Sequence, residues 1–385
     1  MPLEDEHCCM PKNSKQTGTR KHTFKLSNQR ANSDEALLDP QAEQFNDLCR
    51  LALEIAQLQP WRFMEETDVF GVQDPETGEL GFVSVMGALG QYQAIAVYRG
   101  SEGLYGWIDF EDLLQVDPTS EQAHDMLMEI PQLQLAFSPA GLLEKRDREK
   151  IRNSGLKFPG AKPVFRSYRP GYVPWFLTSA EASHLIHVLT QTIDVARRFE
   201  KDPDVITVGD DAETETFMLR VPQIVDSQLV WTDRLQKIEP PPTKLIPFSV
   251  SDAALRQLRA MPKHGTLEID LFRVPAKIGK PHERPRALYT LLVTDAESGF
   301  IYGCEALEAR GGLDLLYASI PEKIAEMLLR TELSIPTQFD VRAERMFDVL
   351  EPLAGELGAA MCLVDELPAI DEAKMALLKY FGIAE

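Results

Sequence analysis

Three consecutive prolines, Pro240 to Pro242, divide this chain of 385 residues. Proline fixes φ and lacks an N–H, so such a run joins neither a helix nor a central strand and favours extended polyproline geometry. It leaves about 200 residues before it and about 145 after it, and both lengths suit single domains. We therefore predict a first α+β domain over residues 33–238, a Pro-rich linker over 239–249 and a second α+β domain over 250–385.

The first 32 residues show neither helical nor strand periodicity. They hold six Lys and Arg against three acids, a charge of 6 − 3 = +3. We interpret residues 1–32 as a disordered tail. The alternative is a partner-binding or nucleic-acid-binding arm with a metal site at His7, Cys8 and Cys9. Adjacent cysteines without a second pair do not enclose a tetrahedral metal, which favours the tail.

Composition excludes several classes of protein. Lys plus Arg number 40 and Asp plus Glu number 60, a net charge of 40 − 60 = −20. This charge repels phosphate backbones and anionic lipid, so we expect neither nucleic acid nor a membrane as partner. No stretch approaches the roughly 18 apolar residues of a membrane span, and the N-terminus lacks the apolar core of a signal peptide. Five Cys, an odd number, make no disulfide framework. We expect a soluble cytoplasmic protein.

The second segment has the clearer pattern of strands and helices. Its connector Thr294 to Gly299 has the Asp and Gly of a hairpin turn. The expected strands are 266–274, 285–293, 300–307, 337–341 and 359–364, and the expected helices are 313–330, 342–357 and 371–380. The predicted order is therefore β-β-β-α-β-α-β-α.

The first segment, after an amphipathic helix over 41–58, is predicted to repeat this order. Its connector Asp74 to Gly78 matches Asp295 to Gly299 in the spacing of Asp, Glu, a hydroxyl residue and Gly. Two more pairings follow in the same order, namely Ile130, Pro131 with Ile335, Pro336 and Val173, Pro174 with Leu367, Pro368. Three ordered pairings favour an internal duplication of one domain.

Three antiparallel strands followed by α-β-α-β-α resemble the ribonuclease H-like fold in element order only. The resemblance implies two Mg²⁺ or Mn²⁺ ions on carboxylates from the first strand, first helix, fourth strand and last helix. Those places hold Asp270, Glu326 or Glu322, Asp340, and Asp371 or Glu372. The alternative is coincidence, because 60 acids fill many positions and Asp also favours helix starts. The fourth strand of the first segment, 132–137, has no acid, so that copy is expected to be non-catalytic.

Three stretches carry a second resemblance. They are Trp61 to Trp107, Arg166 to Trp175, and Leu350 to Pro368. Over residues 40–385 the chain resembles uncharacterised bacterial proteins with two back-to-back domains of unknown function. This resemblance implies bacterial origin and two domains, and it assigns no activity.

The densest cationic and aromatic cluster in the chain lies between the first strands and the prolines. Its predicted ligand-binding residues are Arg166, Arg169, Tyr172 and Trp175. Guanidinium planes and aromatic faces stack bases or hold an anionic ligand. The alternative is a proline-bracketed loop whose aromatics enter the core while its arginines pair with acids.

Two further features give weaker signals for ligand binding. His184 and His187 have the i, i+3 spacing of a helical metal pair, but no matching Cys or His cluster lies nearby. Gly100 and Gly103 precede a helix, where an anion can bind, yet the full phosphate-loop spacing is missing. We assign no metal site to the histidines, and the glycines give only a weak signal for an anion site.

Together these features predict a non-catalytic binding or interaction protein with a protein or small-molecule partner and no cofactor. The alternative is a divalent-metal-dependent phosphodiesterase or nuclease that uses Asp270 and Asp340, with Mg or Mn as cofactor. Convergence of these two carboxylates on one face of a sheet would favour the enzyme.

Overall fold

The chain forms two compact units in a computed structural model. The structure describes residues 39–380 apart from 89, 91, 117–120, 209–214, 243, 245, 281, 282 and 332. The N-terminal unit contains the described residues up to Lys244 together with Ala276–Ala287, and the C-terminal unit contains residues 246–275 and 288–380. The predicted tail, residues 1–32, lies outside the described residues.

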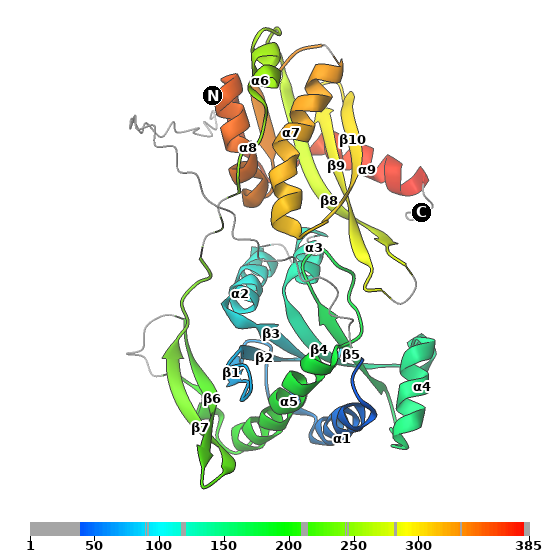
Figure 1. Cartoon of the computed structure of the whole chain (residues 1–385), viewed down its shortest axis with the longest axis vertical. Coiled ribbons are helices and arrows are strands. Elements are labelled where there is room, and N and C mark those ends of the chain that lie inside the picture. The colour runs from blue at the N-terminus through cyan, green and yellow to red at the C-terminus, as the bar shows by residue number, and fades with distance from the viewer. Residues whose placement is uncertain are drawn as a thin grey trace, which may run out of the picture. The chain divides into compact units, whose positions relative to one another are not determined.

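The N-terminal unit is built on a seven-stranded mixed sheet (Figure 1). The strand order is β5-β4-β3-β2-β1-β6-β7, and β1 and β6 are parallel while the other neighbours are antiparallel. The strands are β1 Phe70–Gln73, β2 Leu80–Met86, β3 Ala94–Arg99, β4 Gln132–Ser138, β5 Lys162–Tyr168, β6 Thr216–Val225 and β7 Gln228–Lys237. The α-helices are α1 Ala42–Leu58, α2 Gly100–Val116, α3 Glu121–Glu129, α4 Lys145–Ser154 and α5 Ser179–Phe199.

Alternating side chains give this sheet a core on each face. Val83 and Val97 belong to a buried cluster with residues of α1 and α5, such as Leu48 and Leu185. Their neighbours, including Phe82, Ala96 and Tyr98, belong to a second cluster with Leu104, Trp107 and Phe110 of α2. Because successive residues of a strand point to opposite faces, one run of apolar residues fills both clusters.

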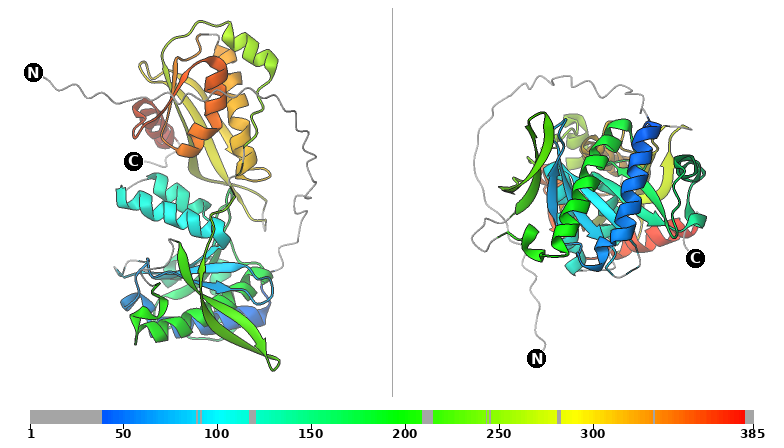
Figure 2. Two further views of the ribbon diagram at one scale, coloured as in Figure 1. Left: turned by 90° about the vertical axis from the view of Figure 1, so that its left-hand side faces the viewer. Right: turned by 90° about the horizontal axis from the view of Figure 1, so that it is seen from below.

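The C-terminal unit is built on a five-stranded sheet in the order β10-β9-β8-β11-β12. The first three strands are antiparallel, and β11 is parallel to both β8 and β12. The strands are β8 Thr266–Ile278, β9 Arg286–Asp295, β10 Ile301–Glu308, β11 Gln338–Val341 and β12 Ala360–Leu363. The helices are α6 Asp252–Arg259, α7 Leu313–Thr331, α8 Glu344–Leu357 and α9 Pro368–Tyr380. Helices α7 and α8 lie on one side of the sheet and α9 on the other (Figure 2). The predicted α+β class is therefore confirmed for both units.

The hairpin turns predicted from the two matching connectors are present. The carboxylates of Asp74 and Asp295 accept bonds from the backbone N–H of Thr77 (2.8 Å) and Ser298 (2.7 Å). Gly78 and Gly299 complete the turns with φ of 75° and 67°, which suits glycine because it has no Cβ. The first turn joins β1 to β2, whereas the second joins β9 to β10, the second and third strands of their sheet.

The two sheets differ in strand order, so the N-terminal unit does not repeat the arrangement of the C-terminal one. In the C-terminal unit a single helix, α7, joins β10 to β11. This helix carries the chain back to the end of the sheet at which β10 began. Two helices, α2 and α3, join β3 to β4, so β4 runs antiparallel beside β3. The predicted repeat missed this extra helix, which reverses the direction of the fourth strand. Internal duplication finds no support in the strand order.

Candidate functional site

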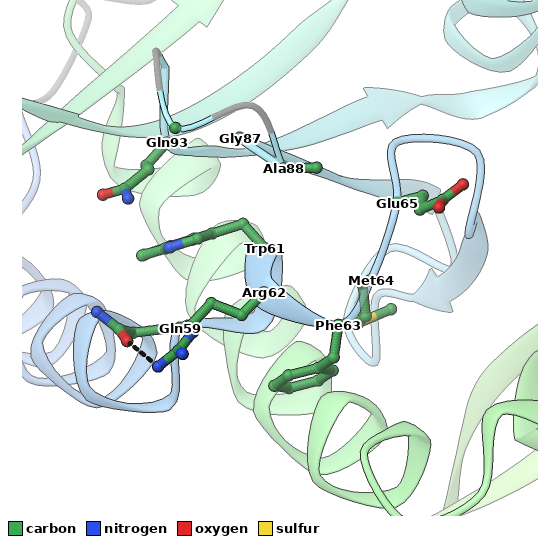
Figure 3. Close-up of a pocket in the computed structure, with 10 residues that line it drawn as sticks. Gln59, Trp61, Arg62, Phe63, Met64, Glu65, Gly87, Ala88 and Gln93 are labelled. Carbon is green, nitrogen blue, oxygen red and sulfur yellow. Dashed lines mark hydrogen bonds between the residues drawn. The ribbon is translucent and has the colours of Figure 1, made fainter.

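A cavity of about 520 Å³ lies in the N-terminal unit between two separate segments of the chain (Figure 3). One segment follows α1, and the other joins β2 to β3. The lining residues are Gln59, Trp61, Arg62, Phe63, Met64, Glu65, Gly87, Ala88, Gly90 and Gln93. This volume falls within the range of pockets that hold small organic molecules.

The apolar wall of this cavity is positioned by the end of α1. Gln59 has left-handed backbone angles and ends the helix, with its N–H bonded to the Ile55 carbonyl oxygen at 2.8 Å. The next residues form the short 3₁₀ helix Pro60–Arg62, which holds the Trp61 side chain against the core. There Trp61 meets Phe137 edge to face, with 5.5 Å between ring centroids. The aromatic wall is therefore fixed before any ligand arrives.

Polar groups surround the apolar wall. The Arg62 guanidinium donates from Nη1 to Oε1 of Gln59 at 3.3 Å, as the dashed line in Figure 3 shows. Glu65 lies on the other side of the view, with its backbone N–H bonded to the Asp68 carboxylate at 2.7 Å. Gln93 adds an amide above Trp61. The cavity thus offers an apolar face, one cation, one anion and two amides.

The sequence-predicted ligand cluster is engaged in contacts within the chain. Arg166 donates to both carboxylate oxygens of Asp147, at 3.0 and 2.6 Å, and its guanidinium covers the Phe176 ring. Backbone bonds in both directions join Trp175 to Ser167. The nearby cavity beside Asp147 and Phe176 has only about 10 Å³, room for about one water. These contacts give Arg166 and Trp175 a structural role, and ligand binding by them stays a prediction.

Arg169 and Tyr172, the other two residues of that cluster, contact different partners. Arg169 donates from Nη2 to Oε1 of Glu181 at 2.8 Å. Tyr172 forms a backbone bridge with Arg286. Neither the 520 Å³ cavity nor the smaller one is lined by these two residues.

Glu181 is the centre of a buried network that the sequence pattern missed. Its carboxylate, 3% exposed, accepts from the Ser167 hydroxyl at 2.7 Å and from the Thr178 N–H at 2.9 Å. Arg99 approaches the same carboxylate at 3.6 Å, and Nη2 of Arg284 lies 3.8 Å from Oε2. Three guanidinium groups, counting that of Arg169, therefore surround one carboxylate.

The charges of this network hold its carboxylate ionised. Burial alone would raise the pKa of Glu181, but the charge of Arg169 and the bonds from Thr178 and Ser167 lower it to about 2. Burial and the charge of Arg169 lower the pKa of Arg284 to about 10. Within the described part of the chain, Nε and Nη2 of Arg284 find no hydrogen-bond partner. Arg284 therefore depends on Glu181 for its charge compensation.

His184 of α5 binds an acid, not a metal. Its Nδ1 lies 2.9 Å from Oδ2 of Asp74, the residue that starts the first hairpin turn. Burial lowers the pKa of His184, so the ring is neutral and donates from Nδ1. Gly81 leaves room for the ring, because a Cβ there would lie 2.9 Å from Nε2. The pair ties α5 to the turn between β1 and β2.

Three of the four predicted catalytic acids lie on the α9 side of the C-terminal sheet. Glu268 is in register with Asp340 on the neighbouring parallel strand, and Asp270 is two residues further along β8, on the same face. Asp371, near the start of α9, accepts from the Arg342 guanidinium at 2.6 Å. Glu326 is on α7, across the sheet, so the structure does not bring it to the other acids. The fourth carboxylate of the group is instead Glu268.

Each of these acids also has a structural partner. Glu268 accepts from the Ile370 N–H at 2.9 Å, which satisfies the N-terminus of α9. Asp270 lies 3.4 Å from Nε of Arg342, which thus stands between Asp270 and Asp371. Burial raises the pKa values of Glu268, Asp270 and Asp340. Over the described residues, no group of three His, Cys, Asp or Glu is arranged to hold a metal ion.

Two family models match this two-domain α+β chain. The Domain of unknown function (DUF7309) matches residues 45–220, and the Domain of unknown function (DUF6930) matches residues 254–378. The predicted pair of back-to-back domains of unknown function is thereby confirmed. A search of the curated proteins finds no match. Among the described helices, none combines the length and the apolar composition that a membrane span requires.

Proposed function

We propose that this protein acts by binding, and that the N-terminal unit takes a small organic anion with an apolar body in the cavity beside Trp61. The observation that carries the proposal is the cavity of about 520 Å³ with one aromatic wall and a few polar groups around it. Binding sites for small molecules combine a preformed apolar surface with a small number of polar groups that fix orientation. Cytoplasmic location and bacterial origin stay predictions from the sequence.

The choice of an anion rests on Arg62. Its guanidinium is exposed and contacts only a neutral amide, Gln59, among the bonds that Figure 3 draws, so its donors can turn to a ligand. A carboxylate or sulfonate would accept bonds from that guanidinium while the apolar body covers Phe63, which is half-buried. Glu65, on the other side, favours ligands whose far end is neutral or cationic.

Anilinonaphthalene sulfonate has this chemistry, and its fluorescence reports transfer to an apolar surface. We expect the full-length protein to bind it and Ala88→Trp, which puts a large side chain at a lining residue of the cavity, to weaken binding about tenfold. Ala140→Trp is the matched control, because Ala140 is also exposed but does not line the cavity. We expect Arg62→Ala to weaken binding by a similar factor and Arg148→Ala, an exposed control, to leave it unchanged. Equal affinities for all four variants would refute the site.

A second function, metal-dependent phosphodiester cleavage, is favoured by one observation. Glu268, Asp270 and Asp340 share the α9 face of the C-terminal sheet. The resemblance of the predicted element order to the ribonuclease H-like fold also supports this alternative. Arg342, which pairs with Asp371, supplies part of the positive charge that a metal would bring. We therefore rank binding above cleavage.

Calorimetric unfolding with Mg²⁺ or Mn²⁺ tests the second function. A metal that binds the folded state raises its unfolding temperature by mass action. We expect neither ion to produce a rise that depends on Asp340. A rise that Asp340→Asn abolishes and the exposed control Asp348→Asn retains would instead support the enzyme.

A further inference from the structure

The ribbon formed by β6 and β7 extends beyond the rest of the N-terminal sheet (Figure 1). Strand β6 pairs with β1 only at Leu219 and Arg220, whereas it pairs with β7 along its whole length. A tight turn with positive φ at Asp226 and Ser227 closes the ribbon. Beyond Arg220, the two strands therefore have only each other as strand neighbours in the described part of the chain.

Apolar side chains on this ribbon are exposed to solvent. Ile224 is 73% exposed and lies opposite Leu229, which is 40% exposed. Leu235, further along β7, is 53% exposed. Strand alternation puts Leu229, Trp231 and Leu235 on one face of β7. Trp231 lies in the same row and packs against the hydrophobic core under α5. The exposed leucines therefore continue an apolar surface that is buried where it meets this core.

Strand β7 is also the outermost strand of the sheet. It spans ten residues with an unbroken register against β6, and it contains no proline. Edge strands that stay single are usually short, bulged, or interrupted by proline or inward-pointing charge. Asp233, the one acid of β7, is already paired with Arg198 and Arg220. The edge therefore has the regular backbone that accepts another strand.

The charge distribution of the chain favours a second copy of this chain as the partner that covers the edge of β7. The net charge of −20 opposes contact between acidic surfaces of two copies. The stretch of β7 from Gln228 to Gln236 has one acid, Asp233, and one base, Arg234, so it carries no net charge and two copies meet there with little repulsion.

Only some registers of two antiparallel β7 strands keep each face of the joined sheet continuous, because side chains alternate. A twofold axis at Asp233 or at Arg234 sets like charges opposite each other. An axis at Thr232 avoids this: it sets Leu229 opposite Leu235 and Val230 opposite Arg234 of the second copy.

We propose that β7 pairs antiparallel with β7 of a second copy of this chain about a twofold axis at Thr232. The pairing joins two seven-stranded sheets into one and covers the exposed leucines of both copies. It is a self-complementary interface of the kind that twofold dimers use.

Size-exclusion chromatography with light scattering tests the pairing on the full chain. We expect twice the mass of one chain, falling to one chain on dilution. Leu235→Lys should give a single chain, because its ammonium would face Leu229 of the other copy. Val225→Lys is the control, since Val225 is exposed on β6, away from the edge. A single-chain mass for the unmodified protein at every concentration would overturn the proposal.

Two substitutions of opposite charge at Val230 test the register of the proposed pairing. Val230→Glu should tighten the dimer, because each new carboxylate faces Arg234 of the other copy, and Val230→Lys should weaken it about tenfold. Val230 is exposed, so far-UV circular dichroism should show both variants folded. Equal weakening by both charges would mean that Arg234 does not face Val230, and the pairing would be wrong.

Discussion

Replacement of Glu181 by Ala is expected to destabilise the N-terminal unit by about 3–5 kcal/mol, the cost of breaking a buried ion pair on one side. The change would leave Arg99, Arg169 and Arg284 close together without their common anion. It would also remove the acceptor of the Thr178 N–H, which the capping box of α5 uses. Urea unfolding followed by tryptophan fluorescence measures the effect, because all four Trp lie in this unit. Glu149→Ala, at an exposed ion pair on α4, should cost under about 1 kcal/mol.

The lowered pKa of the Glu181 carboxyl predicts how the stability of the N-terminal unit changes in acid. A carboxyl with a pKa of about 2 when folded and about 4.5 when unfolded contributes about 3 kcal/mol above pH 4.5. That contribution is lost as the pH falls from about 4.5 toward about 2, because the unfolded chain binds the proton first. The stability difference between the unmodified protein and Glu181→Gln should therefore shrink over this window. A difference that stays constant down to pH 2 would show that Glu181 is not held ionised.

Sequence patterns predicted the local features of this fold and missed those that depend on distant residues. The turns at Asp74 and Asp295 were predictable because all their bonding groups lie within five residues. The strand order of the N-terminal sheet was missed, because it depends on whether one or two helices follow β3. Pro118 and Ser120 do signal a break before α3, but the predicted order allowed only one helix there, so the expected single crossover was wrong.

The candidate sites also depend on contacts between residues far apart in the sequence, which patterns do not predict. The pattern identified Arg166 and Arg169 as unusual, but their acids come from other elements, Asp147 from α4 and Glu181 from α5. His184 lies 110 residues from its partner Asp74. The cavity beside Trp61 has no sequence signature at all, because two segments that share no motif line it. Only the tertiary structure brings such groups together.

Substitution of Gly103 is expected to have the second large effect on stability. The structure gives this glycine a role in close packing, which differs from the anion binding considered from the sequence. A Cβ at Gly103 would lie 2.8 Å from the carbonyl oxygen of Pro131 and 2.8 Å from the carbonyl carbon of Tyr98. These are backbone atoms, and that oxygen accepts the N–H of Arg99 at 2.9 Å. The glycine thus lets the first turn of α2 approach the sheet where β3 ends.

Gly103→Ala should therefore cost about 3 kcal/mol, since overpacking against backbone forces the helix and the end of β3 apart. The shift would also move Arg99, which donates to Glu79 at 2.9 Å. Gly106→Ala, one turn later in the same helix, is the matched control. Its Cβ would meet only side-chain atoms of Ile130, at 3.3 Å or more, and Ala favours a helix by up to about 1 kcal/mol over Gly. Urea unfolding with tryptophan fluorescence should show a large loss for Gly103→Ala and at most a small change for Gly106→Ala. Equal effects would mean that close approach to the backbone does not determine the residue at Gly103.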